Sequence, residues 1–337
     1  MTAGHVDHRR ELEPVPASVL ARDPLLVQVE RQGLVESVHH GRVAITAADG
    51  STISALGAVD APFYPRSSVK PLQAIAMLRH GLDLDGELLA LAASSHDGEP
   101  FHIDGTRRIL TEVGLTEADL QNTPDHPLSA SAKADWIRDH GDPAPVAMNC
   151  SGKHAAMLRT CVRNKWDRGT YLAPEHPLQQ AIVETISEFT GDAVSHVAVD
   201  GCGAPLVAIS LTGLARAFGR IAAATEGPEQ KIADAFRTHP TYASGTTRDE
   251  TTLHRAVPGL VCKAGAEAVY AVGLPDGRGI AVKIDDGASR ARLPVVAQIL
   301  LELGHDHPDI TGATTGPVLG HGKPVGQVSP VVDSFVG

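Results

Sequence analysis

The chain has 337 residues, of which 42% are hydrophobic and 20% charged, a composition typical of a globular protein with one large domain or two intermixed domains. Its net charge of −11 and its aromatic content of 4% argue against nucleic-acid and membrane-surface partners. Residues 1–24 are polar and lack the apolar segment of a signal peptide, and no later stretch is long enough to span a membrane. We therefore expect a cytoplasmic protein with a flexible leader over residues 1–24.

The cysteines and histidines form no familiar metal-binding pattern. Four cysteines in a long chain without a signal peptide do not indicate a disulfide framework. The 17 histidines are scattered, and neither a His-x-x-x-His nor a Cys-x-x-Cys pair is present. From spacing alone, Cys150 and Cys202 are interpreted as buried core cysteines.

The chain opens with predicted antiparallel strands, which cover residues 25–30, 34–39, 42–47 and 51–56. Asp49 and Gly50 lie between the last two and supply the turn chemistry of a hairpin. An antiparallel meander at the start of the chain argues against a βαβ unit.

A helix is predicted next, headed by the sequence PRSSVKP at residues 65–71 and ending at Gly81. Ser67 and Lys70 are three residues apart and would share a face of this helix. A serine hydroxyl needs a nearby base to act as a nucleophile, and a lysine held neutral can be that base. The same spacing also occurs by chance, as a capped helix with an exposed lysine.

A small polar loop over residues 94–100 follows a second apolar helix at residues 87–93. Such a loop after a buried segment is a common place for functional residues. Alternatively, Ser95 or Asp97 caps the helix predicted to run through residues 102–113. Ser94 is an equally possible functional serine.

The middle of the chain is predicted to be helical, and the end returns to strands. Residues 122–145 are rich in proline, aspartate and serine and are expected to form an irregular connection. Helices are predicted at residues 155–162, 174–189, 206–218, 228–237, 250–256 and 288–303, and later strands at 195–199, 268–274, 280–284, 318–319 and 325–328. This order predicts an α+β fold in which an antiparallel sheet is flanked by helices with a helical subdomain. Residues 25–337 would form a single catalytic unit, with sheet parts from 25–62 and 258–337 around a helical middle at 63–257.

Six short motifs are more specific together than any one alone. In chain order they are RSSVKP at 66–71, SH at 95–96, NCSGKH at 149–154, DGC at 200–202, KAGAE at 263–267 and KIDDG at 283–287. Together they resemble the L-asparaginase II family, the Rhizobium-type asparaginases, over about residues 25–330. The resemblance implies a serine β-lactamase/glutaminase-like fold, a homodimer, and hydrolysis of L-asparagine to L-aspartate and ammonia.

The resemblance also implies roles for individual residues. Ser67 with Lys70, and Ser95 with Lys263, match two catalytic serine–lysine pairs. Cys150, Lys153 and Cys202 match a zinc site, and the substrate-binding residues around it are matched by Arg66, His96, His154 and Asp200. Lysine binds a metal only as the neutral amine, so Lys153 would have to lose its proton. The metal would either position the substrate's α-carboxylate or tie residues 149–154 to residues 200–202.

The chemistry can be rebuilt with either serine as nucleophile. One serine would form an acyl-enzyme while the other relays protons, and we favour Ser67 for attack because its lysine lies within the same helical turn. Ser95 activated by Lys263 is the open alternative. Two lysines close together would each lower the pKa of the other, as a lysine base requires.

Two other functions are consistent with parts of the pattern. One is another acyl-serine amidase of the penicillin-recognising type, a glutaminase or β-lactam hydrolase, which shares Ser-x-x-Lys; the chain lacks the Lys-Thr-Gly motif of the β-lactam enzymes. The other is a non-catalytic metal-binding homologue. The loop Asp97-Gly98-Glu99 varies within the family and leaves the choice between asparagine and glutamine open.

Overall fold

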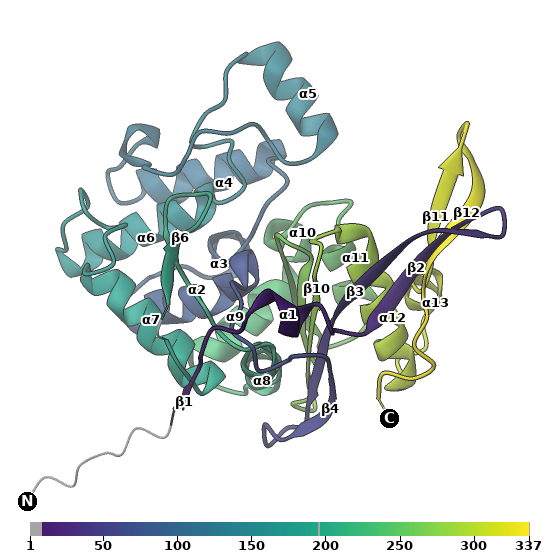
Figure 1. Ribbon diagram of the computed structural model, residues 1–337. Coiled ribbons are helices and arrows are strands. Elements are labelled where there is room, and N and C mark those ends of the chain that lie inside the picture. Colours follow the sequence, from purple (N-terminus) through teal and green to yellow (C-terminus); the bar gives the residue numbers. More distant parts are fainter. Residues whose placement is uncertain (1–8, 195, 337) are drawn as a thin grey trace, which may run out of the picture.

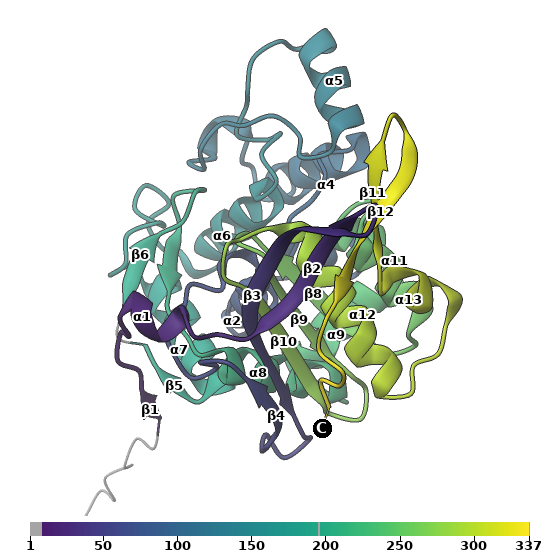
Figure 2. The same cartoon turned by 45° about the vertical axis from the view of Figure 1, so that its right-hand side comes forward.

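An eight-stranded antiparallel sheet is central to the computed structural model, which describes residues 9–194 and 196–336 (Figures 1 and 2). Its strand order is β11-β12-β2-β3-β10-β9-β8, and β4 also pairs with β3. The strands are β2 (Leu25–Arg31), β3 (Leu34–Thr46), β4 (Thr52–Leu56), β8 (Val261–Gly265), β9 (Val269–Gly273), β10 (Gly279–Ile284), β11 (Gly316–Gly320) and β12 (Lys323–Pro330). The two ends of the chain therefore build one sheet, and the predicted α+β fold is confirmed.

The hairpin predicted at residues 42–56 is present as β3 and β4. Gly50 has a φ of +82°, which glycine adopts without steric cost, and the Asp49 carboxylate accepts from the Ser51 amide at 2.9 Å. The hairpin aligns β3 to pair with β10 on its other side, where Val43 faces Val282. The early strands are thus fixed against the late ones.

Side chains alternate between two cores along the strands. Ala44, Ala271 and Ala281 face the helical part and α8 (Leu211–Ala223), whereas Val43 and Val282 face the opposite side. The opposite side is covered by α11 (Asp249–Ala256), α12 (Arg292–Glu302) and α13 (Pro308–Ala313), and η3 (Ser289–Ala291) leads into α12. The strands β8, β9 and β10 are therefore buried on both faces.

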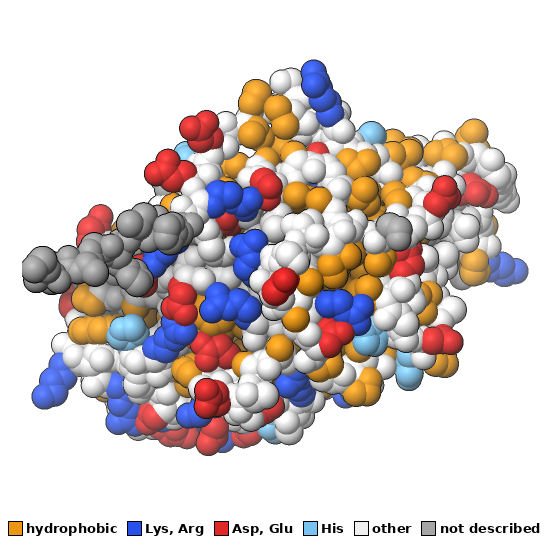
Figure 3. All heavy atoms as spheres, turned by 90° about the horizontal axis from the view of Figure 1, so that it is seen from below, with side chains coloured by type: hydrophobic (Ala, Val, Ile, Leu, Met, Phe, Trp, Pro, Cys, Tyr) orange, Lys and Arg blue, Asp and Glu red, His pale blue; other side chains and the backbone are white. Residues whose placement is uncertain are grey.

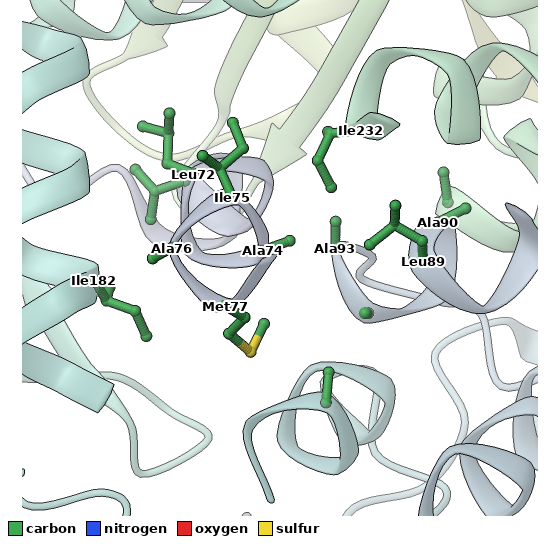
Figure 4. Close-up of a cluster of buried hydrophobic side chains, with 14 of the residues drawn as sticks. Leu72, Ala74, Ile75, Ala76, Met77, Leu89, Ala90, Ala93, Ile182 and Ile232 are labelled. Carbon is green, nitrogen blue, oxygen red and sulfur yellow. The ribbon is translucent and has the colours of Figure 1, made fainter. Parts of the chain in front are cut away.

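The helical part surrounds α2 (Lys70–Arg79), which follows the 3₁₀ turn η1 (Arg66–Val69). Residues 70–77 of α2 are all buried, as expected for a helix enclosed by others, and Leu72, Ile75 and Met77 point in different directions from its axis (Figure 4). The neighbouring helices are α3 (Gly86–Ala92), α4 (Pro100–Thr111), α5 (Ala130–Asp139), α6 (Ser151–Asn164), α7 (Pro177–Thr190), α9 (Gly227–Thr238) and α10 (Pro240–Ala243), with the turn η2 (Glu117–Asp119). The turn η1, which contains Ser67, is thereby attached to a buried helix.

Several predicted elements differ in detail. Residues 122–145 contain the helix α5, with Ser129 as its N-cap, and the helix predicted from residue 206 begins at Leu211 after strand β7 (Pro205–Val207). Strand β7 pairs with β6 (Val197–Val199), and residue 195 of the predicted strand lies outside the described residues. Helix α4 is capped by Glu99 rather than by Ser95 or Asp97, so those two predicted caps are wrong. Ser95 and Asp97 are therefore available for other contacts.

The expected leader over residues 1–24 stays a prediction. Its residues 1–8 lie outside the described part of the chain. Residues 9–24 contain β1 (Arg10–Glu11), which pairs with β5 (Asp192–Ala193), and the short helix α1 (Ala17–Leu20). Arg10 is also bonded to the buried Asp192, at 3.0 Å.

The surface seen in Figure 3 carries acidic and basic side chains interspersed with apolar ones. Within residues 9–194 and 196–336, none of the helices combines the length and the apolar character needed to cross a bilayer.

Candidate active site

The two predicted catalytic serines, Ser67 and Ser95, line the same pocket. A cavity of about 260 Å³ is lined by Ser67, Ser95, Leu128, Asn149, Arg248, Ala264, Gly265, Ala266, Ser289 and Arg292. Ser67 comes from η1 and Ser95 from the loop after α3, while residues 264–266 end strand β8. The helical part and the edge of the sheet therefore meet at this pocket.

Ser67 follows a residue with an unusual backbone conformation. Arg66 has a φ of +53°, in the left-handed region that costs free energy for residues other than glycine. The Ser67 side chain is half-buried, and within the described part of the chain its hydroxyl has no hydrogen-bond partner. Ser67 is thus a pocket-facing hydroxyl that no other contact holds.

Lys70 is bonded to the other serine. Its side chain is 1% exposed, and its Nζ donates to Ser95 Oγ at 2.8 Å, to Cys150 Sγ at 3.1 Å and to the Ser94 carbonyl. Ser94 Oγ is buried and unpartnered among the described residues, so the hydroxyl that Lys70 contacts is that of Ser95. Ser67 and Lys70 share the start of one helix, yet the lysine amine reaches across to residue 95.

Lys263 is held by a buried carboxylate. Its Nζ donates to Glu250 Oε1 at 3.1 Å and to the Ala264 carbonyl at 2.9 Å, and both side chains of the ion pair are 1% exposed. Burial lowers the pKa of Lys263, and the nearby Lys70 lowers it further, while Glu250 opposes the change. Lys263 directly precedes the pocket-lining Ala264 on β8, and its amine is bonded to Glu250 rather than to Ser95.

The predicted metal ligands lie together beneath Lys70. Lys153 Nζ donates to Cys202 Sγ at 3.2 Å, and Cys150 Sγ donates to Asn149 Oδ1 at 3.1 Å. The interaction between the two thiols, with the charge of Lys153, lowers the pKa of Cys202, and the same interaction raises the pKa of Cys150 together with burial. Burial works against the charge of Lys153, but the neighbouring Cys202 and Cys150 outweigh it and raise the pKa of the lysine.

These donors fit zinc if Lys153 takes part. Among the described residues no three His, Cys, Asp or Glu side chains gather closely enough to hold a metal by themselves. Two cysteine sulfurs and an amine form a set of ligands that zinc accepts, once the amine is neutral. His154 adds a buried Nε2 without a hydrogen-bond partner within the described chain, and its Nδ1 is bonded to the Tyr171 hydroxyl at 2.7 Å. Burial lowers the pKa of His154 to about 4, so this imidazole is neutral.

The four predicted substrate-binding residues lie around the pocket rather than in its lining. Arg66 Nε donates to Asp200 Oδ1 at 2.8 Å, and Arg66 lines a separate cavity of about 820 Å³ together with Lys283 and Asp285 of the KIDDG motif. His96 is buried, with Nε2 2.9 Å from Ser151 Oγ, and burial holds its pKa well below the usual value.

The sequence reasoning missed four polar residues that line the pocket. Asn149 is the first residue of the NCSGKH motif, and Arg248 lies in the polar stretch before α11, so both could have been considered. Ser289 and Arg292 belong to no motif and approach the pocket only through the packing of η3 and α12 on the sheet.

Comparisons with known proteins agree with these motifs. The model of the family described as L-asparaginase II matches residues 27–330. No curated protein matched the chain.

Among solved structures, similar ones include Mglu (TM-score 0.44, 14% identity, 86% of this chain and 73% of that one) and a β-lactamase from Mycobacterium bovis (0.43, 16%, 85% and 98%). A Bacillus glutaminase gives a TM-score of 0.38 at 12% identity, covering 78% of this chain and 84% of that chain. With TM-scores below 0.5, these likenesses bear on neither the substrate nor the mechanism. The family match, by contrast, covers nearly the whole chain, and the protein belongs to the L-asparaginase II family.

Proposed function

We propose that this amidohydrolase converts L-asparagine to L-aspartate and ammonia through an acyl-serine intermediate. The observation that carries the proposal is the hydrogen bond of 2.8 Å between Lys70 Nζ and Ser95 Oγ, beside a pocket that Ser95 shares with Ser67. A buried amine bonded to a pocket hydroxyl is the arrangement that proton transfer during amide hydrolysis requires. The name of the family supplies asparagine as the substrate.

Ser67 is the nucleophile in this proposal, and Ser95 connects it to the base. Ser67 is the more exposed hydroxyl and has no competing hydrogen bond among the described residues, whereas Ser95 is 7% exposed and already bonded to Lys70. A nucleophile must reach the substrate carbonyl, while a relay must stay bonded to the base. The amide of Ser67 lies in the first turn of η1, where helix amides lack helical acceptors, and it can donate to the oxyanion.

The proposed hydrolysis has an acylation half and a deacylation half. Neutral Lys70 receives the Ser67 proton through Ser95 as Ser67 Oγ bonds to the side-chain amide carbon. The carbon–nitrogen bond breaks, and the same proton returns to the leaving nitrogen to give ammonia. Water attacks the acyl-serine, and its proton passes back to Ser67, which releases L-aspartate. Lys263 supports this cycle through its ion pair with Glu250, which also accepts from the amide of the pocket-lining Ala264 and so fixes the end of β8 beside the serines.

Cys150, Lys153 and Cys202 are proposed to hold a zinc ion. When bound, zinc would tie the start of α6 to the turn at Cys202 through thiolate and amine ligands. Cys150 contacts Lys70 at 3.1 Å, so this tie would fix the surroundings of the base. The homodimer and the cytoplasmic location stay predictions from the sequence.

The test is mass spectrometry of the protein quenched during turnover of L-asparagine. Wild type and Ser95→Ala should carry an aspartyl adduct on Ser67, accumulating more slowly in the variant, and Ser67→Ala should carry none. Ser131→Ala, an exposed serine on α5, is the matched control and should behave as wild type. An adduct on Ser95 in the Ser67→Ala protein would reverse the two serine roles.

A further inference from the structure

Two arginines line the catalytic pocket together with the two serines. Arg248 precedes α11 and Arg292 is the first residue of α12, and both line the cavity with Ser67 and Ser95. Neither belongs to the motifs that identify the family. The mechanism proposed above gives neither of them a role.

Arg292 is held in place from three sides. Its Nη1 donates to the Gly265 carbonyl at 3.0 Å, and its guanidinium lies over the Tyr270 ring, 5.3 Å from the centroid. Its Nη2 is 3.6 Å from Asp249 Oδ2. The side chain is 11% exposed, and the Nε atom is buried without a partner among the described residues. A guanidinium fixed in this way loses little conformational entropy when it binds a ligand.

Arg248 is fixed by the neighbouring carboxylates. Its Nε donates to Glu250 Oε2 at 3.0 Å, and its Nη1 is 3.8 Å from Asp97 Oδ1. Its side chain is 24% exposed, compared with 1% for Glu250. The Nε atom of Arg248 is thus occupied by Glu250, and the Arg248 side chain lines the cavity.

The carboxyl groups that contact the two arginines lie outside the lining of the pocket. Both arginines line the pocket, whereas Asp97, Asp249 and Glu250 do not. Glu250 contacts Arg248, Lys263 and the Ala264 amide, so one buried side chain holds Arg248 and Lys263 in place. A ligand entering the pocket therefore meets the two guanidinium groups, with the buried carboxylate of Glu250 behind Arg248. A guanidinium binds a carboxylate through paired charge-assisted hydrogen bonds, which are among the strongest polar contacts in proteins.

We propose that Arg248 and Arg292 form a carboxylate subsite that holds the free α-carboxylate of the substrate while its amide faces Ser67. The placement of the amide against Ser67 rests on the proposed amide hydrolysis. It restricts the substrate class to small amides that carry a free carboxylate. Arg248 and Arg292 act as positioning residues, and Glu250 holds one of them.

Two measurements on the full-length protein test the subsite. The first is calorimetric binding of L-aspartate to wild type, Arg248→Gln and Arg292→Gln. The second compares kcat/KM for L-asparagine and for 3-aminopropanamide, the same molecule without its carboxylate. Arg290→Gln is the matched control, because Arg290 lies two residues from Arg292 and bonds instead to His39 and Ser37. Arg292→Lys keeps the charge without the paired donors, and thermal unfolding checks that each variant is folded.

We expect the Kd for L-aspartate to rise at least tenfold in both glutamine variants, less in Arg292→Lys, and not at all in Arg290→Gln. The preference of wild type for L-asparagine over 3-aminopropanamide should shrink by a similar factor, with KM raised more than kcat is lowered. Unchanged aspartate affinity in both folded glutamine variants, or no aspartate binding by wild type, would overturn the subsite. Arginine-dependent aspartate binding without ammonia release from L-asparagine would instead keep the subsite and remove the proposed function.

Discussion

Lys70 Nζ lies 2.8 Å from the hydroxyl of Ser95, a residue 25 positions away, and not against Ser67, three positions away. Both predicted catalytic serines nevertheless line one pocket, so a single buried lysine serves a site built from two segments. Lys263, the second predicted base, is bonded to Glu250. The geometry therefore links Lys70 with Ser95 and places Lys263 in a separate ion pair.

Replacing Lys70 by methionine should remove the proton acceptor while preserving the shape of the buried side chain. We expect kcat for amide hydrolysis to fall by roughly 10²–10⁴, the range typical of a general base. Steady-state ammonia release measures the change, with circular dichroism as the check on folding. Lys133→Met, on the exposed helix α5, is the control. A folded Lys70→Met protein that keeps kcat within a factor of three would show that Lys70 is not the base.

Glu250→Gln should destabilise the protein strongly. Burial opposes the charge of Glu250, but Lys263 and Arg248 outweigh it and hold the pKa of the carboxylate well below its usual value. Removing one partner of a buried ion pair costs about 3–5 kcal/mol, because the other charge is left unpaired. Urea unfolding at pH 7 measures the loss. Glu36→Gln breaks an exposed pair with Arg31 and should cost less than about 1 kcal/mol. Similar losses in the two variants would contradict the central position of Glu250.

The stability of the protein should depend on pH through Asp249. Burial, together with Glu250, raises the pKa of Asp249 to about 7. An aspartate in the unfolded chain ionises near pH 4, so between about pH 4 and pH 7 the folded state holds a proton that the unfolded state has lost. The contribution of Asp249 is therefore complete at the acidic end of this window, falls as the pH rises, and is lost above pH 7.

Asp249→Asn imitates the protonated side chain and should remove this decline. Relative to wild type, its free energy of unfolding should improve by roughly 2–3 kcal/mol between pH 5 and pH 8. Urea titrations across that range test the difference, with Asp104→Asn on the surface of α4 as the control. Parallel pH curves for wild type and Asp249→Asn would rule out the raised pKa.

Zinc binding should depend on Cys202 and Lys153. Cys202→Ser removes a soft ligand and Lys153→Met removes the amine, so the zinc bound per chain after dialysis should fall below one tenth of the wild-type value. Elemental analysis of the purified proteins gives this number without reference to activity. Cys161→Ala changes another buried cysteine outside this cluster and should retain the metal. Equal zinc contents in all four proteins would remove the proposed site.

The sheet and the hairpin could be predicted because local patterns specify them. Alternating side chains and the Asp49-Gly50 turn are visible in the sequence, and β3 and β4 form there as expected. The strand β8 was harder to recognise: all five of its residues are buried, and a fully buried strand lacks the alternation that marks a half-exposed one. The cap of α4 was misassigned because Glu99 is an uncommon N-cap, and its capping box has His102 at the position where glutamate or glutamine is usual.

In the candidate site, too, some residues could be predicted from local motifs and others are placed only by packing. The motifs pointed to Ser67, Ser95 and the Cys150–Lys153–Cys202 group, and the structure brings the serines to one pocket and the cysteines and lysine to one cluster. The partner of Lys70 could not be inferred, because a long flexible side chain reaches beyond the residues that share its helical face. Arg292 had no local pattern, since only the packing of α12 on the sheet brings it to the pocket.

The most direct test of the account is ammonia release from L-asparagine and from L-glutamine, measured side by side with metal-replete wild type and Ser67→Ala. The account predicts release from L-asparagine by wild type and its loss in the folded variant. Release from L-glutamine alone would change the substrate but keep the chemistry. No release from either amide by wild type would leave the fold and the family in place and contradict the proposed activity.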